Sequence, residues 1–124
     1  MNISQITGVY FSPTGSTKRV TEWITERIAG NREAECLDLT DAASSRPDYT
    51  FTEHELAVVG VPVYGGRVPE TARERLQKIH GKRTPAVLIV TYGNRAYEDA
   101  LLELSDILKE QGLTVSLENT IGGI

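Results

Sequence analysis

The sequence predicts an α/β fold built on a doubly wound, five-stranded parallel sheet with the strand order 2-1-3-4-5. Two observations support this prediction. Short apolar segments alternate along the chain with longer segments whose apolar residues recur every three to four positions, as strands alternate with helices. Most of the short segments are apolar almost throughout, which is typical of parallel strands covered by helices on both faces. Right-handed crossovers leave few other arrangements.

The first half of the chain begins with a predicted strand over residues 3–11. The helix predicted over Ser16–Ala29 has an apolar face, which we expect in the core, and it stops at Gly30. That face is formed by Val20, Trp23, Ile24 and Ile28. Residues 34–39 form a shorter, more polar strand, which we place at the sheet edge. We expect a turn of helix at most in the polar crossover over residues 40–54.

The second half continues the alternation, with the third strand over residues 56–61 and the fourth over residues 86–90. Between them a helix starts with Pro69 in its first turn, where a missing N–H is no loss, and it ends at Gly81. Its inner face carries Ala72, Leu76 and Ile79. A third helix, with Ala100, Leu101, Leu104 and Leu108 on its inner face, precedes the fifth strand over residues 113–119.

Doubly wound domains usually end with a helix after the fifth strand, and the sequence stops before one. We therefore expect the C-terminal helix to be missing and one face of the sheet to be left open. A large open apolar face is a liability in water. We expect that the chain is a fragment of a longer protein, with self-association through the open face as the consequence.

Charge and composition argue against several classes of partner and site. With 13 basic and 17 acidic residues, the chain has a formal net charge of −4, which argues against nucleic acid or an anionic membrane as a partner. No apolar run reaches the roughly 18 residues of a membrane span. The single cysteine, Cys36, cannot form an internal disulfide, so a reducing cytoplasm fits best. His54 and His80 stand alone, and we predict no metal site.

The most informative segment joins the first strand to the first helix. It reads Ser12, Pro13, Thr14, Gly15, Ser16 and Thr17. Such a loop presents hydroxyls and backbone N–H groups to one point, where the helix N-terminus adds partial positive charge. It has neither the glycine and lysine spacing of nucleoside-triphosphate loops nor the three spaced glycines of dinucleotide loops. We predict a site for a single phosphate monoester, with simple capping of the helix as the structural alternative.

Two further loops should meet the first, because the first, third and fourth strands end together where the strand order reverses. The second loop contains Pro62, Val63, Tyr64, Gly65 and Gly66. The third loop contains Tyr92, Gly93, Asn94 and Tyr97. Each loop holds a tyrosine beside small residues, which suits a flat ring lying close to the backbone. A phosphate beside a planar ring predicts a mononucleotide-like cofactor.

The loop over residues 11–17 resembles the phosphate loop of the flavodoxin family, a Ser/Thr-x-Thr-Gly-x-Thr pattern, and Gly93 with Tyr97 resembles that family's flavin-edge loop. The second and third loops most resemble those of flavodoxin-like domains that occur alone or fused to a bacterial-type iron–sulfur ferredoxin. The resemblance covers essentially the whole chain and implies flavin mononucleotide (FMN) as cofactor. The residues that it implicates are Ser12, Thr14 and Thr17 for the phosphate, and Tyr64 and Tyr97 for the isoalloxazine ring.

The function expected from this resemblance is that of a one-electron carrier between redox proteins, with no catalytic side chain. Gly65 and Gly66 give the backbone freedom to turn a carbonyl toward flavin N5 when that atom takes a proton on reduction. A dry site among acidic residues disfavours negative charge near flavin N1, which gives a low potential. Arg67 or Arg95 would oppose this effect if either reached N1.

Two other functions stay open. A small NAD(P)H-dependent reductase would use the same FMN to reduce a quinone, a flavin or a metal, but its nicotinamide pocket usually needs longer loops or a second subunit. A flavodoxin-like binding module would hold no flavin. We expect redox proteins as partners, with a ferredoxin-type iron–sulfur domain among them. We interpret Glu98, Asp99 and Glu103 as a solvated helix start, where the helix dipole favours acids.

Overall fold

The computed structural model describes residues 2–41, 47–91 and 98–121, with side chains up to residue 115. The strands of the described residues are β1 Gln5–Tyr10, β2 Glu33–Asp38, β3 Tyr49–Thr50, β4 Glu55–Pro62, β5 Ile79–His80, β6 Thr84–Thr91 and β7 Leu113–Ile121. The helices are α1 Ser16–Ala29, α2 Glu70–Leu76 and α3 Glu98–Glu110.

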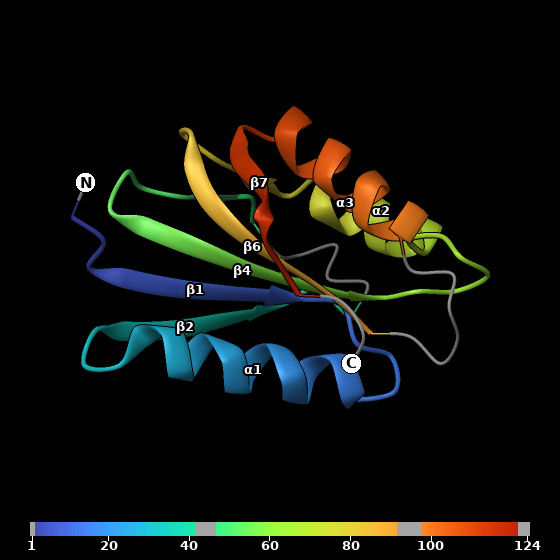
Figure 1. Ribbon diagram of the computed structural model, residues 1–124, viewed down its shortest axis with the longest axis horizontal. Coiled ribbons are helices and arrows are strands. Elements are labelled where there is room, and N and C mark those ends of the chain that lie inside the picture. The colour runs from blue at the N-terminus through green and yellow to red at the C-terminus, as the bar shows by residue number, and fades with distance from the viewer. Residues whose placement is uncertain (1, 42–46, 92–97, 122–124) are drawn as a thin grey trace.

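The main sheet has five parallel strands in the order β2-β1-β4-β6-β7. Because β3 and β5 lie outside this sheet, the order confirms the predicted doubly wound topology. Helix α1 covers one face, and α2 and α3 cover the other (Figure 1). Tyr10 pairs with Gly60, and Pro62 pairs with Thr91, so β1, β4 and β6 end at the same edge of the sheet.

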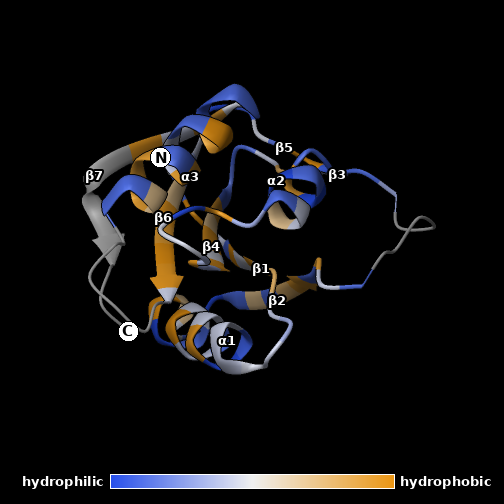
Figure 2. Cartoon of the chain, turned by 90° about the vertical axis from the view of Figure 1, so that its right-hand side faces the viewer, coloured by the Kyte–Doolittle hydropathy of each residue, from blue (hydrophilic) through white to orange (hydrophobic). Residues whose placement is uncertain are grey.

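The core forms two apolar clusters, one on each face of the sheet. The larger cluster includes Val59 on β4 and Leu104 on α3. The smaller cluster joins Ile24 on α1 to Ile6 and Val58 on β1 and β4. Figure 2 shows the apolar strand β6 between the two helical layers. None of the described helices is long and apolar enough to cross a membrane.

The prediction that Trp23 lies in the core is wrong. Its side chain is 60% exposed, and the Arg27 guanidinium lies 5.1 Å from its ring centre. Threonines occupy the seam between α1 and the sheet instead. Gly8 and Gly60 let the helix approach so closely that a Cβ on Gly60 would lie 2.0 Å from the Thr21 hydroxyl oxygen. An indole does not fit so narrow a seam, and α1 therefore packs threonines against the two glycines while Trp23 lies at the surface.

The polar crossover contains β3, which pairs with β5 in a small second sheet and was not predicted. The prediction for the second helix is also wrong at its end, because α2 stops at Leu76 and does not reach Gly81. Ile79, expected on the inner face of that helix, is buried in β5. The β-branched side chain of Ile79 favours an extended strand. Ile79 therefore pairs with β3 as part of a strand and does not extend α2 by another turn.

The small sheet is joined to the main sheet by the buried carboxylate of Glu55. This carboxylate accepts hydrogen bonds from the hydroxyls of Thr7 and Tyr49, both at 2.6 Å, and from the backbone N–H of Thr52 at 2.8 Å. A buried charge needs such partners to replace water. Burial, together with the hydrogen bond to Glu55, raises the pKa of Tyr49 to about 12. Glu55 begins β4, at the end opposite the predicted cofactor loops, so we assign the network a structural role.

Candidate cofactor-binding site

The carboxyl ends of β1, β4 and β6 lie side by side at one edge of the sheet (Figure 1). The Phe11 N–H donates to the Gly60 carbonyl oxygen at 3.1 Å, and the Val63 N–H donates to the Thr91 carbonyl oxygen at 2.9 Å. Neighbouring strands therefore stay paired up to the residues where the chain leaves the sheet. The structure thus brings the first two predicted loops together with the residue that precedes the third.

The first loop is shaped by Ser12 and Gly15. The Ser12 hydroxyl accepts a hydrogen bond from the Lys18 N–H at 2.9 Å, and the Ser12 N–H donates to the Thr40 hydroxyl at 2.8 Å. Gly15 is the N-cap of α1 and has a φ of 93°, a left-handed conformation that other residues rarely adopt. Pro13 lies exposed between them. The capping role considered for this loop therefore belongs to the side chain of Ser12.

The start of α1 still holds donors for a ligand. The first four N–H groups of a helix lack intrahelical partners, and Ser12 satisfies only one of them. Those of Gly15, Ser16 and Thr17 have no partner among the residues that the structure describes. Thr14 and Ser16 are exposed, and their hydroxyl oxygens lie 3.5 Å apart. These amides and hydroxyls at the positive end of a helix fit a phosphate monoester.

The side chain of Thr17 faces the sheet and not the loop. Thr17 is 1% exposed, and its hydroxyl oxygen lies 2.7 Å from that of Thr91. This hydrogen bond ties the first turn of α1 to the end of β6, where the third loop begins. The hydroxyl of Thr17 therefore joins the first loop to the last residue of β6, and its backbone N–H is the group left for a ligand.

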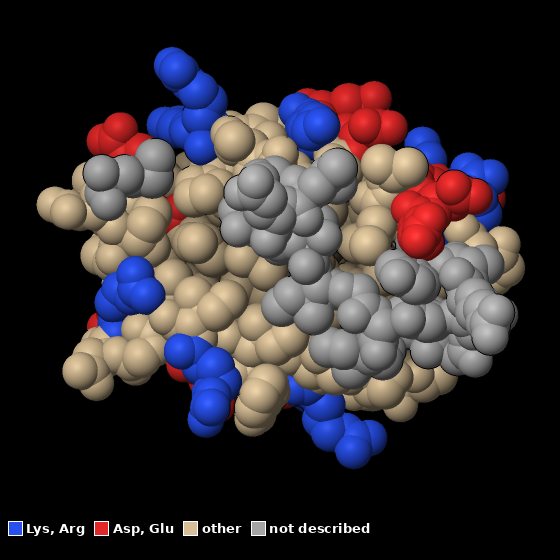
Figure 3. Space-filling view, in the orientation of Figure 1, with Lys and Arg blue, Asp and Glu red and all other residues tan. Residues whose placement is uncertain are grey.

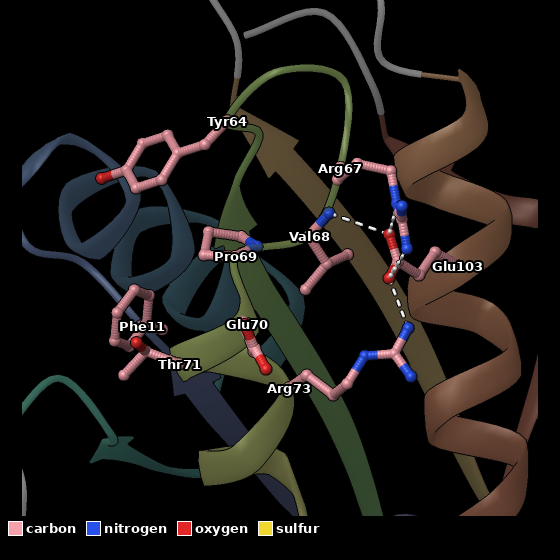
Figure 4. Close-up of a pocket in the computed structure, with 9 residues that line it drawn as sticks. All are labelled: Phe11, Tyr64, Arg67, Val68, Pro69, Glu70, Thr71, Arg73 and Glu103. Carbon is pink, nitrogen blue, oxygen red and sulfur yellow. Dashed lines mark hydrogen bonds and ion pairs between the residues drawn. The ribbon is translucent and has the colours of Figure 1, made fainter.

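The second loop is a tight two-residue turn. The backbone groups of Tyr64 and Arg67 exchange two hydrogen bonds of 3.0 Å, and Gly65 and Gly66 between them have φ values of 58° and 77°. Two successive positive φ angles favour glycine at both positions. Tyr64 is 49% exposed, and its ring points away from the side of the turn that carries Arg67 (Figure 4). The turn therefore presents an aromatic face to solvent. Before it, Pro62 is buried and Val63 is half-buried.

Glu103 on α3 forms hydrogen bonds with Arg67 and Val68 at the end of this turn, a role that the sequence did not predict. The Arg67 guanidinium donates two hydrogen bonds to the Glu103 carboxylate, at 3.0 and 3.1 Å, and Arg73 on α2 donates another. The hydrogen bond from Arg67 lowers the pKa of Glu103, burial raises it, and the hydrogen bond from Arg73 lowers it further. The net result is a pKa of about 2. The side chain of Glu103 is only 11% exposed, so it is not the solvated acid that we expected. Its partners are 36 and 30 residues away, and no local pattern marks such a contact.

An open groove of about 750 Å³ lies beside the second loop (Figure 4). Tyr64 and Phe11 line one part of it, and Arg67, Arg73 and Glu103 line another. The arginines in its wall are paired with Glu103, so the groove is not a cluster of free cations.

The predicted residues of the third loop lie outside the described residues. They are Tyr92, Gly93, Asn94 and Tyr97, and Arg95 lies among them. Only the flanks of this loop are described, with Thr91 at the end of β6 and Glu98 at the start of α3. Within the described ranges, no group of three or more His, Cys, Asp or Glu side chains is arranged to hold a metal ion.

A comparison with protein families decides the assignment of the chain. A family model described as a flavodoxin domain matches residues 9–120. The chain belongs to the flavodoxin domain family. The match includes the last two residues of β1, all of β4 and β6, and both loops that the structure describes at the candidate site. No curated protein matches this flavodoxin domain.

Solved structures share the fold of this flavodoxin domain. A flavodoxin from the domain Archaea has a TM-score of 0.63 and 19% identity, with 96% of this chain and 83% of that chain covered. The flavodoxin of Fusobacterium nucleatum, solved with FMN bound, has a TM-score of 0.64 and 16% identity, with 90% and 68% covered. Rubredoxin oxygen:oxidoreductase from Desulfovibrio gigas has a TM-score of 0.69 and 14% identity over 98% of this chain, but only 30% of its own chain is covered. At such identities the likeness shows the fold alone.

Proposed function

We propose that this flavodoxin domain binds FMN and carries single electrons between redox proteins. One observation carries the proposal: a helix start whose N–H groups have no partner in the described part of the chain lies at the same sheet edge as a glycine turn with an exposed tyrosine. Membership of the flavodoxin domain family supports it. So does the fold shared with a Fusobacterium flavodoxin that was solved with FMN bound.

The phosphate of FMN would be held by the first loop. The N–H groups of Gly15, Ser16 and Thr17 have no partner within residues 2–41, 47–91 and 98–121, and they supply donors that need no side chain. The exposed hydroxyls of Thr14 and Ser16 add two more. The Ser12 hydroxyl accepts a hydrogen bond from the Lys18 N–H, which shapes the loop, and the backbone amides would supply most of the phosphate contacts. Such a site suits a phosphate monoester better than a di- or triphosphate, which would need a longer loop.

Bound FMN supplies the redox chemistry, and the chain holds the ring and sets the charge around it. Tyr64 offers an aromatic face beside the glycine turn. Gly65 and Gly66 let the backbone lie close to a planar ring, and their peptide can reorient at low cost. Arg67 is engaged by Glu103 and is therefore not a free cation beside the turn. With the Arg67 charge paired to Glu103, that side chain does little to stabilise negative charge on the ring, which favours a low potential.

The partners that we propose are redox proteins, including domains of the iron–sulfur ferredoxin type. Helix α3, which follows the third loop, carries one lysine and four exposed acidic residues besides the paired Glu103, namely Glu98, Asp99, Asp106 and Glu110. Figure 3 shows acidic side chains gathered over this helix. Such a surface would steer a partner of positive charge toward the neighbouring site.

The proposal is tested by comparing FMN with riboflavin, which has the same ring and lacks the phosphate. The flavin-free chain is titrated with each compound, and binding is followed by the change in flavin fluorescence. We expect FMN to bind at least ~100-fold more tightly than riboflavin, because several N–H and hydroxyl donors contact only the phosphate. A chain that binds neither compound refutes the proposal. Equal affinity for both would refute the phosphate site.

Two variants distinguish a direct effect of the first loop on FMN affinity from a general effect on the fold. The double variant T14A/S16A removes the two exposed hydroxyls and should weaken FMN binding by ~10-fold while leaving riboflavin unaffected. T50A removes an exposed threonine from β3, away from the predicted cofactor loops, and should change neither affinity. Reduction of the FMN-loaded chain by NADH or NADPH at many turnovers per second would favour the reductase alternative over an electron carrier.

A further inference from the structure

The carboxylate of Glu103 accepts four hydrogen bonds, three from the residues that follow the glycine turn and one from α2. Oε1 accepts from Arg67 Nε at 3.0 Å and from the Val68 backbone N–H at 3.0 Å. Oε2 accepts from the Arg67 terminal nitrogen at 3.1 Å and from the Arg73 guanidinium. Arg67 and Val68 follow the glycine turn, Arg73 is on α2, and Glu103 itself is on α3. One side chain therefore connects the turn to two helices (Figure 4).

The contacts of Glu103 define which part of the second loop is free to move. On the incoming side, the Val63 N–H is bonded to the Thr91 carbonyl oxygen on β6. On the outgoing side, Arg67 and Val68 are held by Glu103. The segment between these two anchors is short and contains Gly65 and Gly66 at its centre. Backbone freedom is thus confined to the glycine peptide, and the position of the turn is set by its anchors.

Glu103 also decides where the Arg67 charge lies. The Arg67 side chain is 68% exposed, so little except the carboxylate restrains it. In the structure, its guanidinium lies on the α3 side of the turn, and Tyr64 points to the other side (Figure 4). Without the carboxylate, both arginines would be left uncompensated within reach of the turn.

We propose that Glu103 is a positioning residue for the flavin: it anchors the Tyr64–Arg67 turn on α3 and keeps the Arg67 charge away from the ring. This inference rests on the proposed binding of FMN. The second loop then depends for its position on a carboxylate of α3, the helix that follows the third loop.

The test compares E103A, E103Q and a matched control, D106N. E103A removes both the anchor and the charge. E103Q keeps an oxygen that can accept from the Val68 N–H but removes the charge that holds Arg67. D106N removes one exposed negative charge from the same helix, one turn further along, and the structure gives Asp106 no ion pair among the described residues. Three quantities are measured: hydrogen exchange of the Val68 amide without flavin, the FMN dissociation constant, and the midpoint potentials of bound FMN.

In E103A the Val68 amide should exchange ~10-fold faster and FMN should bind ~10-fold more weakly, because an anchored turn becomes free. In E103Q the amide should stay protected, but the midpoint potentials should rise, because the Arg67 charge is no longer compensated. D106N should change the exchange rate and the affinity by less than about twofold.

The outcomes separate the inference from the proposed function. A wild-type chain that binds no FMN refutes both. A wild-type chain that binds FMN, with E103A and E103Q indistinguishable from D106N in all three measurements, refutes only the positioning role. If E103A does not fold, E103Q decides: a rise in potential well above that of D106N supports the inference, and an equal shift overturns it.

Discussion

Replacing Thr17 by valine should destabilise the flavin-free chain by about 1–2 kcal/mol and change its FMN affinity little. Valine has nearly the shape of threonine, so packing is kept and only the hydroxyl is lost. That hydroxyl lies 2.7 Å from the Thr91 hydroxyl in a buried site, where Thr17 is 1% and Thr91 is 8% exposed. The cost has two parts: the lost hydrogen bond, and the Thr91 hydroxyl left buried without that partner.

Unfolding by urea gives the stability change, with the variants T91V and T17V/T91V completing a double-mutant cycle. If the two hydroxyls bond each other, the double variant should be less destabilised than the sum of the single variants by about 1 kcal/mol, because no orphan hydroxyl remains. The control is T14V at an exposed position. We expect the opposite pattern there, with stability unchanged within about 0.5 kcal/mol and FMN bound more weakly.

The family resemblance implies a different role for Thr17, in which its side chain binds the phosphate of FMN. If its hydroxyl binds the phosphate, T17V should weaken FMN by ~10-fold or more and leave the flavin-free stability unchanged. A coupling free energy near zero between Thr17 and Thr91 would refute the buried pair independently.

Three further predictions concern the framework of the site. G60A should cost about 1–3 kcal/mol in urea unfolding, because its Cβ would lie 2.0 Å from the Thr21 hydroxyl oxygen, and adding T21A should restore part of the loss. Y49F should reduce the free energy of unfolding by about 1–2 kcal/mol, because it removes a hydrogen-bond donor to Glu55. This difference should shrink above pH 10. The pKa of Tyr49 is raised to about 12 in the folded chain, so the wild type loses this stabilisation as the pH rises from 10 to 12. The pKa of Glu103 is lowered from 4.5 to about 2 in the folded chain. After allowance for its exposed arginine partners, ionised Glu103 should add about 1 kcal/mol to the free energy of unfolding above pH 4.5. This contribution should be lost as the pH falls toward 2. A wild-type minus E103Q difference that does not change between pH 6 and pH 2 would contradict the last prediction.

The main sheet could be predicted because its information is local. Strands such as β4 and β6 are apolar at nearly every position, and each is followed by a segment with helical periodicity. Handedness then restricts how such units join. The small sheet of β3 and β5 has no such signal, because each strand contains only two residues. Whether Ile79 continues a helix or pairs with Tyr49 depends on a contact 30 residues away in the chain.

Trp23 shows a different limit of periodicity. A three-and-four spacing identifies the side of a helix that holds apolar residues, but the width of the seam decides which of them enter. On α1 the seam is set by Gly8 and Gly60 on two neighbouring strands, and it admits threonines. An apolar residue next to that seam then lies at the surface, as Trp23 does. The packing distance is a property of helix and sheet together, so no pattern within the helix reports it.

The candidate site was predictable in its location but not in the use of its hydroxyls. Ser12, Thr14 and Thr17 belong to one motif, yet the structure gives them three different environments. Ser12 caps α1, Thr14 is exposed, and Thr17 is paired with Thr91, which lies 74 residues further along the chain. A hydroxyl takes the partner that its packing brings near, and a backbone amide at a helix start has no such choice. The backbone amides are therefore the part of this motif that stays available to a ligand whichever partners the hydroxyls take.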